Sequence, residues 1–262
     1  MTSKKKAIMN KRCTDESIDV ILNRFPKIRP ELPDSYKRIY EKHYKENRQG
    51  CSMASWWSQK LESWMHKKVA SDLKCNNKEL PTLEIGAGTL NHLPYEPSIK
   101  PYDIVEPFSE LYKLSPRLNY IRKIFHDIKE IPPNYKYERV ISIATFEHIA
   151  NLPEVVSRIS FLLTHGGKLR VGIPSEGTLL WGLAQKLTTG LEFKLRYGLD
   201  YGVLTKHEHI NTAKEIEEIL QYFFSNVRYG VFGLNRNISL YQFFVCSNPC
   251  IDKSESYLEK VR

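Results

Sequence analysis

Apolar residues from position 81 onward fall into short runs that stop at polar or glycine positions. Runs of four to eight residues bounded by turn signals are typical of buried strands. Seven such runs predict seven strands, over residues 81–85, 102–105, 118–125, 139–145, 168–173, 227–232 and 238–245. The first five are expected to be parallel, because their near-continuous apolar character is typical of strands buried on both faces.

Segments between these runs have helical spacing instead. Pro153 lies in the first turn of a predicted helix whose apolar residues recur up to Leu163, and Gly166-Gly167 is expected to end it. A Thr212-x-x-Glu215 capping box predicts the start of another helix. Strands that alternate with helices predict an α/β fold, doubly wound around one sheet.

A glycine loop follows the first run. Glu84 precedes Gly86-Ala87-Gly88, where the backbone can turn sharply and approach a ligand with no Cβ between. Glu106 closes the second run about 20 residues on, where a mononucleotide-binding unit has its ribose-binding acid. NAD and S-adenosylmethionine both fit this spacing. The NAD fingerprint needs a third glycine where Asn91 stands and has no use for Glu84, so the loop favours S-adenosylmethionine.

The next two runs continue the series of polar strand ends. His126-Asp127-Ile128 closes the third run, and Thr145 leads from the fourth into Phe146-Glu147-His148-Ile149. Over residues 80–246 the ordered set resembles the class I S-adenosylmethionine-dependent methyltransferases, and the Glu-His pair resembles their broad type 11 subset. The resemblance implies a seven-stranded Rossmann-like sheet with an antiparallel last strand. Leu90 departs from it, because many members carry a third alternate glycine there.

The resemblance also implies roles for particular residues. Glu106 would accept hydrogen bonds from both ribose hydroxyls, and Asp127 would accept one from the adenine amino group beside the Ile128 amide. Glu84 would hold the loop or the ammonium group of the cofactor, and Thr145 would face the methionine moiety. The expected cofactor residues are Glu84, Gly86, Ala87, Gly88, Glu106, Asp127, Ile128 and Thr145. For Glu106 and Asp127, an ordinary surface carboxylate is the alternative.

Residues 174–210 are too long for a simple link between a strand and a helix. Loops of that length are usually functional, and open α/β sheets bind ligands above the carboxyl ends of their strands, so this segment predicts a substrate lid containing a short helix from Leu179. The candidate catalytic bases are His209, His148 and His207, because imidazole titrates near neutral pH. His207 and His209 are expected on one side of an extended stretch. A structural histidine is the alternative, and an amine acceptor needs no base.

The chain is expected to divide into a flexible basic segment over residues 1–33, helices covering the cofactor site over 34–80, the methyltransferase domain over 81–250 and a tail over 251–262. An apolar stripe that includes Trp57 is expected to pack in the core. Tyr44 and residues 49–53 are better candidates for ligand contact.

Charge and cysteines limit the possible partners. Of the net charge of +9, residues 1–80 carry +8, from 18 Lys and Arg against 10 Asp and Glu. Such an arm binds nucleic acid, an anionic substrate or a membrane surface, or is only solvated. Five scattered cysteines favour free thiols, and Cys246 and Cys250 alone make no zinc site. No metal is expected, because the acids are spaced along different strands and form no ligand cluster. The sequence shows neither a signal peptide nor an 18-residue apolar run, which favours the cytoplasm without membrane insertion.

The acceptor is predicted less directly. The chain lacks the strand-four motif of DNA amino-methyltransferases and the Pro-Cys pair of cytosine-5 enzymes. Residues 172–212 are similar to methyltransferases encoded with bacterial capsule and lipopolysaccharide genes, which implies a sugar, nucleotide-activated or phosphate-type precursor of a surface polysaccharide. Two alternatives stay open: an RNA or protein methyltransferase that uses the basic arm, and a catalytically inactive cofactor-binding module. The oligomeric state is open as well.

Overall fold

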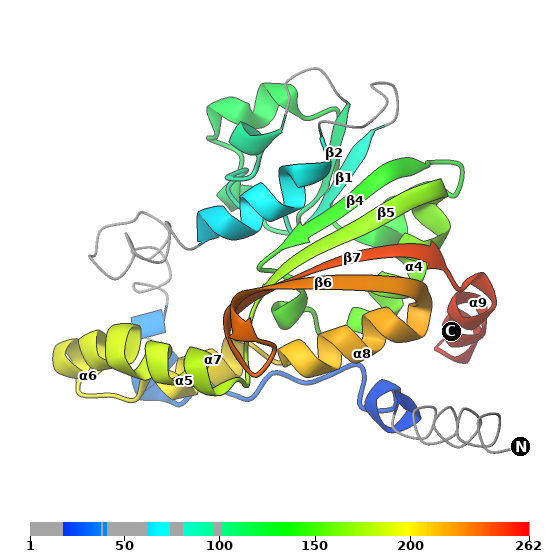
Figure 1. Cartoon of the computed structure of the whole chain (residues 1–262). Coiled ribbons are helices and arrows are strands. Elements are labelled where there is room, and N and C mark those ends of the chain that lie inside the picture. The colour runs from blue at the N-terminus through cyan, green and yellow to red at the C-terminus, as the bar shows by residue number, and fades with distance from the viewer. Residues whose placement is uncertain (1–17, 38, 41–61, 74–80, 97–100, 262) are drawn as a thin grey trace, which may run out of the picture.

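The computed structural model describes residues 18–37, 39–40, 62–73, 81–96 and 101–261. They form a seven-stranded sheet of order β3-β2-β1-β4-β5-β7-β6 (Figure 1). β1 to β5 pair in parallel, whereas β7 is antiparallel to both β5 and β6. The strands are β1 Thr82–Ile85, β2 Tyr102–Val105, β3 Lys123–Phe125, β4 Tyr137–Ile143, β5 Leu163–Pro174, β6 Phe224–Asn235 and β7 Ile238–Pro249. The α/β class, the seven strands and the antiparallel last strand are confirmed.

The third apolar run was predicted as one strand from Leu118, and this is wrong in its first half. Residues Pro116–Tyr120 form a 3-10 helix, and only Lys123–Phe125 join the sheet. Ser115 starts the helix by accepting a hydrogen bond from the Arg117 amide at 3.3 Å, and Pro116 already has a suitable φ. Local capping therefore outweighs the apolar pattern here.

Each face of the sheet has its own apolar core, because successive residues of a strand point to opposite sides. Val140 of β4 belongs to the face covered by α4, α8 and α9, and its neighbour Ile141 belongs to the other. Met65 and Val69, in the helical residues 62–69, cover that second face. The first-face helices are α4 Leu152–Leu162, α8 Ala213–Phe223 and α9 Ile251–Lys260.

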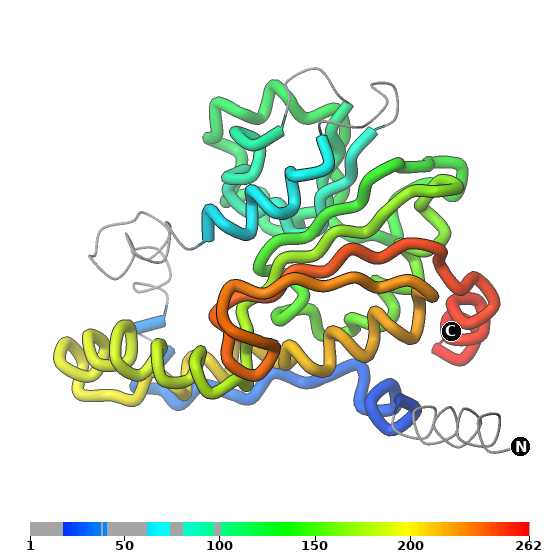
Figure 2. The backbone as a smooth tube through the Cα atoms, viewed as in Figure 1, coloured from blue at the N-terminus to red at the C-terminus, as the bar shows by residue number. Residues whose placement is uncertain are grey.

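Residues 18–33 and 251–260 pack against the domain, which differs from the flexible segment and the tail expected there. Residues 18–33 were predicted as part of a flexible segment, but Ile18, Ile21 and Leu22 form an apolar helical face that packs into the first core. The following residues run beside α8 toward the lid (Figure 2), where Lys27 Nζ lies 2.8 Å from Glu215 Oε1. The expected tail forms α9, which packs through Tyr257 against Phe223.

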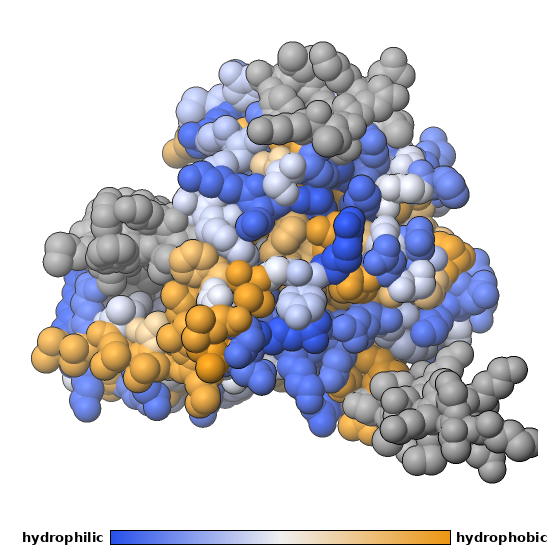
Figure 3. Space-filling view, viewed as in Figure 1, coloured by the Kyte–Doolittle hydropathy of each residue, from blue (hydrophilic) through white to orange (hydrophobic). Residues whose placement is uncertain are grey.

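The lid consists of helices. After β5 come α5 Leu179–Gln185, a π-helical turn Lys186–Gly190, α6 Leu191–Tyr197 and α7 Tyr201–Glu208. Tyr36 and Leu32 from the N-terminal segment pack against Phe193 and Leu204 of the lid in a small core of their own. Five leucines four residues apart face solvent along α5, the π-turn and α6, where Figure 3 shows an apolar surface; they are Leu179, Leu183, Leu187, Leu191 and Leu195.

Several expectations fall on residues outside the described part of the chain. These are residues 1–17, Tyr44, residues 49–53, Trp57 and the cysteines at 13, 51 and 75. In the expected helical region 34–80, residues 34–37, 39–40 and 62–69 are helical. Within the described ranges, no helix is both long enough and apolar enough to cross a membrane.

Candidate active site

The glycine loop after β1 has the sharp turn that its sequence predicts. Gly86 has a φ of +74°, and a Cβ added there would lie 2.2 Å from the Thr145 Cγ2 atom, so no larger residue fits. Gly88 has a φ of +51° but open space around it. Leu90 also adopts a left-handed φ of +62°, with its side chain fully buried. The loop backbone is therefore left-handed at Leu90 as well as at the two glycines, and the leucine side chain anchors the loop in the core.

Glu106 joins the loop to the end of β2. Its Oε2 atom accepts a hydrogen bond from the Gly88 amide at 2.7 Å, and its Oε1 atom accepts one from the Phe108 amide at 3.0 Å. Only 4% of the residue is exposed. Two backbone amides therefore hold a buried carboxylate at the carboxyl edge of the sheet. This geometry supports the loop, and the ribose contact expected for Glu106 stays a prediction.

Glu84 lies in β1, completely enclosed. Tyr102 donates a hydrogen bond from its hydroxyl to Glu84 Oε2 at 2.7 Å. Burial raises the pKa of Glu84 to about 7, although the His92 charge and the Tyr102 hydrogen bond act in the opposite direction. The carboxyl group is therefore partly protonated near neutral pH, which a carboxylate exposed on the surface would not be.

The remaining expected cofactor residues lie at adjacent strand ends. The Asp127 side chain is exposed and accepts a hydrogen bond from the Lys129 amide at 2.8 Å, while Ile128 is buried. Thr145 follows β4 and donates to the Gly86 carbonyl at 3.3 Å. Ala87 is buried within the loop. Because β3, β2, β1 and β4 are neighbours and parallel, all these positions share one edge of the sheet.

The structure brings two of the three candidate histidines together. The rings of His148 and His209 meet edge to face with centroids 4.8 Å apart. His207 was expected in an extended stretch beside His209, and this is wrong: it belongs to α7, and its Nδ1 atom lies 2.6 Å from the Pro30 carbonyl oxygen. The helix continues through Glu208, so His207 and His209 do not alternate as strand residues do.

Glu147 is the functional candidate that sequence reasoning missed. It is 1% exposed and lies beside the histidine pair, with Oε1 3.9 Å from His148 Nε2. Burial raises its pKa to about 7, against the lowering effect of the His209 charge. Its position directly before His148 was visible in the sequence, but its burial was not. The amides of Ile210 and Asn211, where the lid rejoins the domain, bond to its backbone carbonyl oxygen at 2.9 and 3.1 Å.

The N-terminal segment holds the lid against this cluster. Arg29 donates hydrogen bonds to the carbonyl oxygens of His148, His207 and Glu208 at 2.7 to 3.1 Å. Asn211, at the other side, donates to the carbonyl oxygens of Phe146 and Ile149 at 2.8 Å. Contacts from both directions therefore fix the backbone around His148 and His209.

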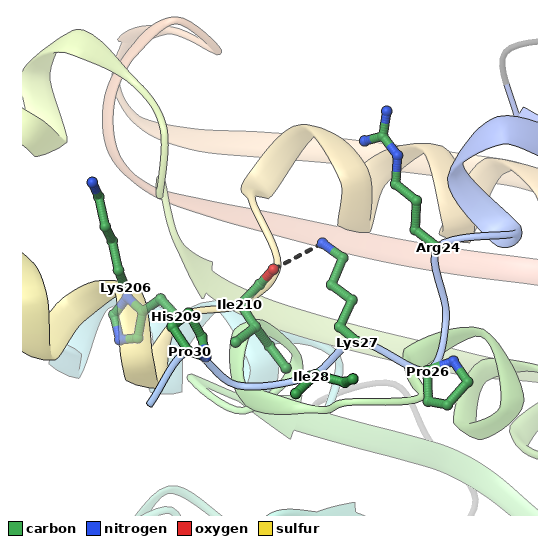
Figure 4. A pocket seen from close by; sticks show the side chains of 8 residues that line it. All are labelled: Arg24, Pro26, Lys27, Ile28, Pro30, Lys206, His209 and Ile210. Carbon is green, nitrogen blue, oxygen red and sulfur yellow. Dashed lines mark hydrogen bonds between the residues drawn. The ribbon is translucent and has the colours of Figure 1, made fainter. Parts of the chain in front are cut away.

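A surface pocket of about 600 Å³ opens beside His209 (Figure 4). The N-terminal segment forms one wall, and Lys206, His209 and Ile210 form the other. Three of its lining residues are basic: Arg24, Lys27 and Lys206. Lys27 is engaged internally, since its Nζ atom donates to the Ile210 carbonyl oxygen and to Glu215, both at 2.8 Å. Its charge is therefore partly compensated within the protein.

Comparisons with known proteins extend this description. No protein-family model matches the chain, and no curated protein sequence does. Among solved structures, it is similar to the plantazolicin methyltransferase BpumL in complex with SAH (TM-score 0.55, 14% identity, 90% of this chain and 100% of that one). It is also similar to the CurJ carbon methyltransferase (TM-score 0.52, 15% identity, 94% of this chain and 70% of that one). A third similar structure is a possible histamine N-methyltransferase from Thermotoga maritima (TM-score 0.50, 13% identity, 81% of this chain and 97% of that one).

At such low sequence identities, these similarities show the fold alone. The plantazolicin methyltransferase BpumL has been solved with SAH, the demethylated cofactor, bound. The chain therefore has the class I fold of S-adenosylmethionine-dependent methyltransferases.

Proposed function

We propose that the protein transfers a methyl group from S-adenosylmethionine to a small molecule or glycan, most specifically a sugar or phosphate-type precursor of a bacterial surface polysaccharide. One juxtaposition carries this proposal. Thr145 donates a hydrogen bond to the glycine loop, and His148 follows it closely in the chain. His209, at the end of the lid, packs its ring against that of His148. The glycine loop and the histidine pair therefore lie at the same strand end, where a bound cofactor and a proton acceptor would meet.

The cofactor would lie over the carboxyl edge of β1, β2 and β3. Glu106 would bind the ribose hydroxyls with the two carboxylate oxygens that now hold the Gly88 and Phe108 amides, since a carboxylate oxygen can accept more than one hydrogen bond. Asp127 and the Ile128 amide would bind the adenine. Glu84 would support the loop from beneath, because its carboxyl group is enclosed and bonded to Tyr102.

The chemical step is an in-line displacement at the sulfonium methyl group. The acceptor oxygen forms a bond to the methyl carbon, the carbon–sulfur bond breaks, and its electron pair stays on the sulfur of SAH. A hydroxyl acceptor must also lose its proton, which the paired imidazoles promote. Proximity and orientation account for about 7–11 kcal/mol of such a barrier, and loss of a positioned base typically costs about 100- to 10,000-fold in rate.

The pocket beside His209 favours an anionic acceptor. Arg24 and Lys206 line it, and the residues that line it include no acid. Phosphate and carboxylate groups are attracted to such basic walls. The names of the similar structures do not decide between acceptors, because they include a plantazolicin enzyme, a carbon methyltransferase and a possible histamine enzyme.

A mass-spectrometric screen tests the proposal. The full chain is incubated with deuteromethyl-labelled S-adenosylmethionine and a panel of nucleotide sugars and phosphorylated glycan precursors, and products with the labelled methyl mass are sought. His207→Ala serves as control, because His207 lies outside the paired cluster. Absence of S-adenosylmethionine and SAH binding in calorimetry would overturn the proposal. Methylation of RNA or of a protein instead of the panel would overturn the acceptor class.

A further inference from the structure

Glu147, His148 and His209 form a compact group of potential metal ligands. One ligand atom from each lies within 4.8 Å of the others, although the lid separates His209 from the other two in sequence. Two imidazoles and one carboxylate are a recurrent ligand set for divalent transition-metal ions, and catalytic zinc sites commonly have three protein ligands and an open position. The sequence could not reveal this group, because the fold creates it.

The second ring nitrogen of each histidine is already bonded. His209 Nδ1 lies 2.9 Å from Glu176 Oε2, and His148 Nδ1 lies 2.9 Å from the Glu208 carbonyl oxygen. If His209 Nδ1 carries the proton and donates to Glu176, its Nε2 has its lone pair available for a ligand. Metal-binding histidines almost always have a carboxylate or a backbone carbonyl as partner of their other nitrogen. The Nδ1 atoms of both histidines have a partner of this kind.

Glu147, the third member of the group, provides an independent observation that points to a bound cation. Glu147 Oε2 is buried and accepts no hydrogen bond from any described residue. An unpaired buried carboxylate oxygen costs free energy, because it gives up water without a replacement. Glu62, Glu176 and Glu208 add further negative charge around the group. A bound cation would satisfy the oxygen and compensate this charge.

We infer that Glu147, His148 and His209 bind a divalent transition-metal ion such as Zn²⁺, which also binds the acceptor hydroxyl. This inference rests on the proposed methyl transfer for its role, and it replaces direct proton removal by a histidine. The ion lowers the pKa of the bound hydroxyl, whose proton leaves to solvent water. The resulting oxyanion attacks the methyl carbon as the carbon–sulfur bond breaks.

The test measures metal binding directly, on tag-free full-length protein freed of metal with a chelator. Zn²⁺ is titrated in competition with a chromophoric chelator, and one bound equivalent is expected. Glu147→Gln and His209→Ala should weaken binding by more than about 100-fold, and Glu176→Gln, which acts through His209, by about 10- to 100-fold. His207→Ala is the matched control and should bind as the parent protein does.

Two outcomes would overturn the inference: a parent protein that binds no Zn²⁺, or Glu147→Gln and His209→Ala variants that bind it unchanged. If His209→Ala fails to fold, the near-isosteric Glu147→Gln decides. If both variants fail to fold, the visible absorption spectrum of Co²⁺ added to the parent protein decides. Imidazole and carboxylate ligands must give a spectrum unlike that of aqueous Co²⁺.

Assays of turnover and of cofactor binding separate this result from the proposed function. Turnover that survives complete metal removal leaves the methyltransferase proposal intact and overturns the metal inference. Tight, cluster-dependent Zn²⁺ binding in a protein that does not bind S-adenosylmethionine supports the site and overturns the methyl transfer.

Discussion

Replacing Glu84 by Gln should change how the stability of the protein depends on pH. Glu84 is fully enclosed in β1, and its pKa is raised to about 7, first by burial, with Glu96 and Glu106 adding to the effect. His92 and the Tyr102 hydroxyl, which donates a hydrogen bond at 2.7 Å, act in the opposite direction. A glutamine has nearly the same shape and keeps a carbonyl acceptor for Tyr102, but it has no proton to lose.

The magnitude follows from the difference between the folded and unfolded pKa values. A folded value of about 7 against the unfolded 4.5 corresponds to roughly 3 kcal/mol, since one pKa unit is about 1.4 kcal/mol. Because the folded pKa is raised, the stabilising contribution is complete below pH 4.5 and is lost as pH rises through about 7. Relative to the parent protein, Glu84→Gln should therefore gain up to roughly 3 kcal/mol between pH 4.5 and pH 8.

Urea unfolding at pH 5, 6, 7 and 8, followed by tryptophan fluorescence without cofactor, measures this difference. His66 is also buried, with a pKa lowered to about 3, so both proteins lose stability as pH falls below 6.5, and that loss cancels in the comparison. Glu110→Gln is the control, because the Glu110 side chain is 75% exposed. Unfolding free energies of parent and Glu84→Gln that run parallel over this pH range would refute the reasoning.

Three further predictions concern the loop and the sheet. Gly86→Ala should destabilise the protein by about 1–3 kcal/mol in thermal melts, because its Cβ meets Thr145, whereas Gly88→Ala should cost about 1 kcal/mol from backbone strain alone. Glu106→Gln should weaken S-adenosylmethionine binding about 10- to 100-fold in calorimetry, the range for a hydrogen bond to a charged group. Arg139→Met should cost about 3–5 kcal/mol in urea unfolding, because it leaves buried carboxylates without their cation.

The strands and the cofactor loop could be predicted because they depend on local pattern. Residues 81–85 and 102–105 read as buried strands, and β1 and β2 occupy nearly these positions. Thr212 and Glu215 form the expected capping box, with both reciprocal hydrogen bonds. Glycines with positive φ and an apolar run with a fixed period are properties of neighbouring residues, so one sequence is enough to reveal them.

The chemical cluster could be predicted only in part, because it depends on contacts distant in the sequence. His148 and His209 are 61 positions apart and meet only when the lid folds back onto β4. Glu147 was visible in the sequence only as the residue before His148, and its burial and the bonds from the amides of residues 210 and 211 to its carbonyl oxygen appear only in the fold. Residues 201–208 form α7 instead of the extended stretch expected for His207, and Asp200 starts this helix by accepting a hydrogen bond from the Gly202 amide.

The basic excess of the first 80 residues illustrates the same limit. By charge alone it allowed either an anionic partner or a merely solvated segment, but two of its cations serve the fold: Lys27 binds Glu215 and the Ile210 carbonyl, and Arg29 binds three carbonyl oxygens around His148 and the end of α7. Carbonyl groups at the end of a helix lack partners within it, so a guanidinium group stabilises them. Net charge thus overstates what this segment offers an external partner. Its described part instead connects lid and sheet, and even Arg24, which lines the pocket, lies 3.7 Å from Glu215 Oε1.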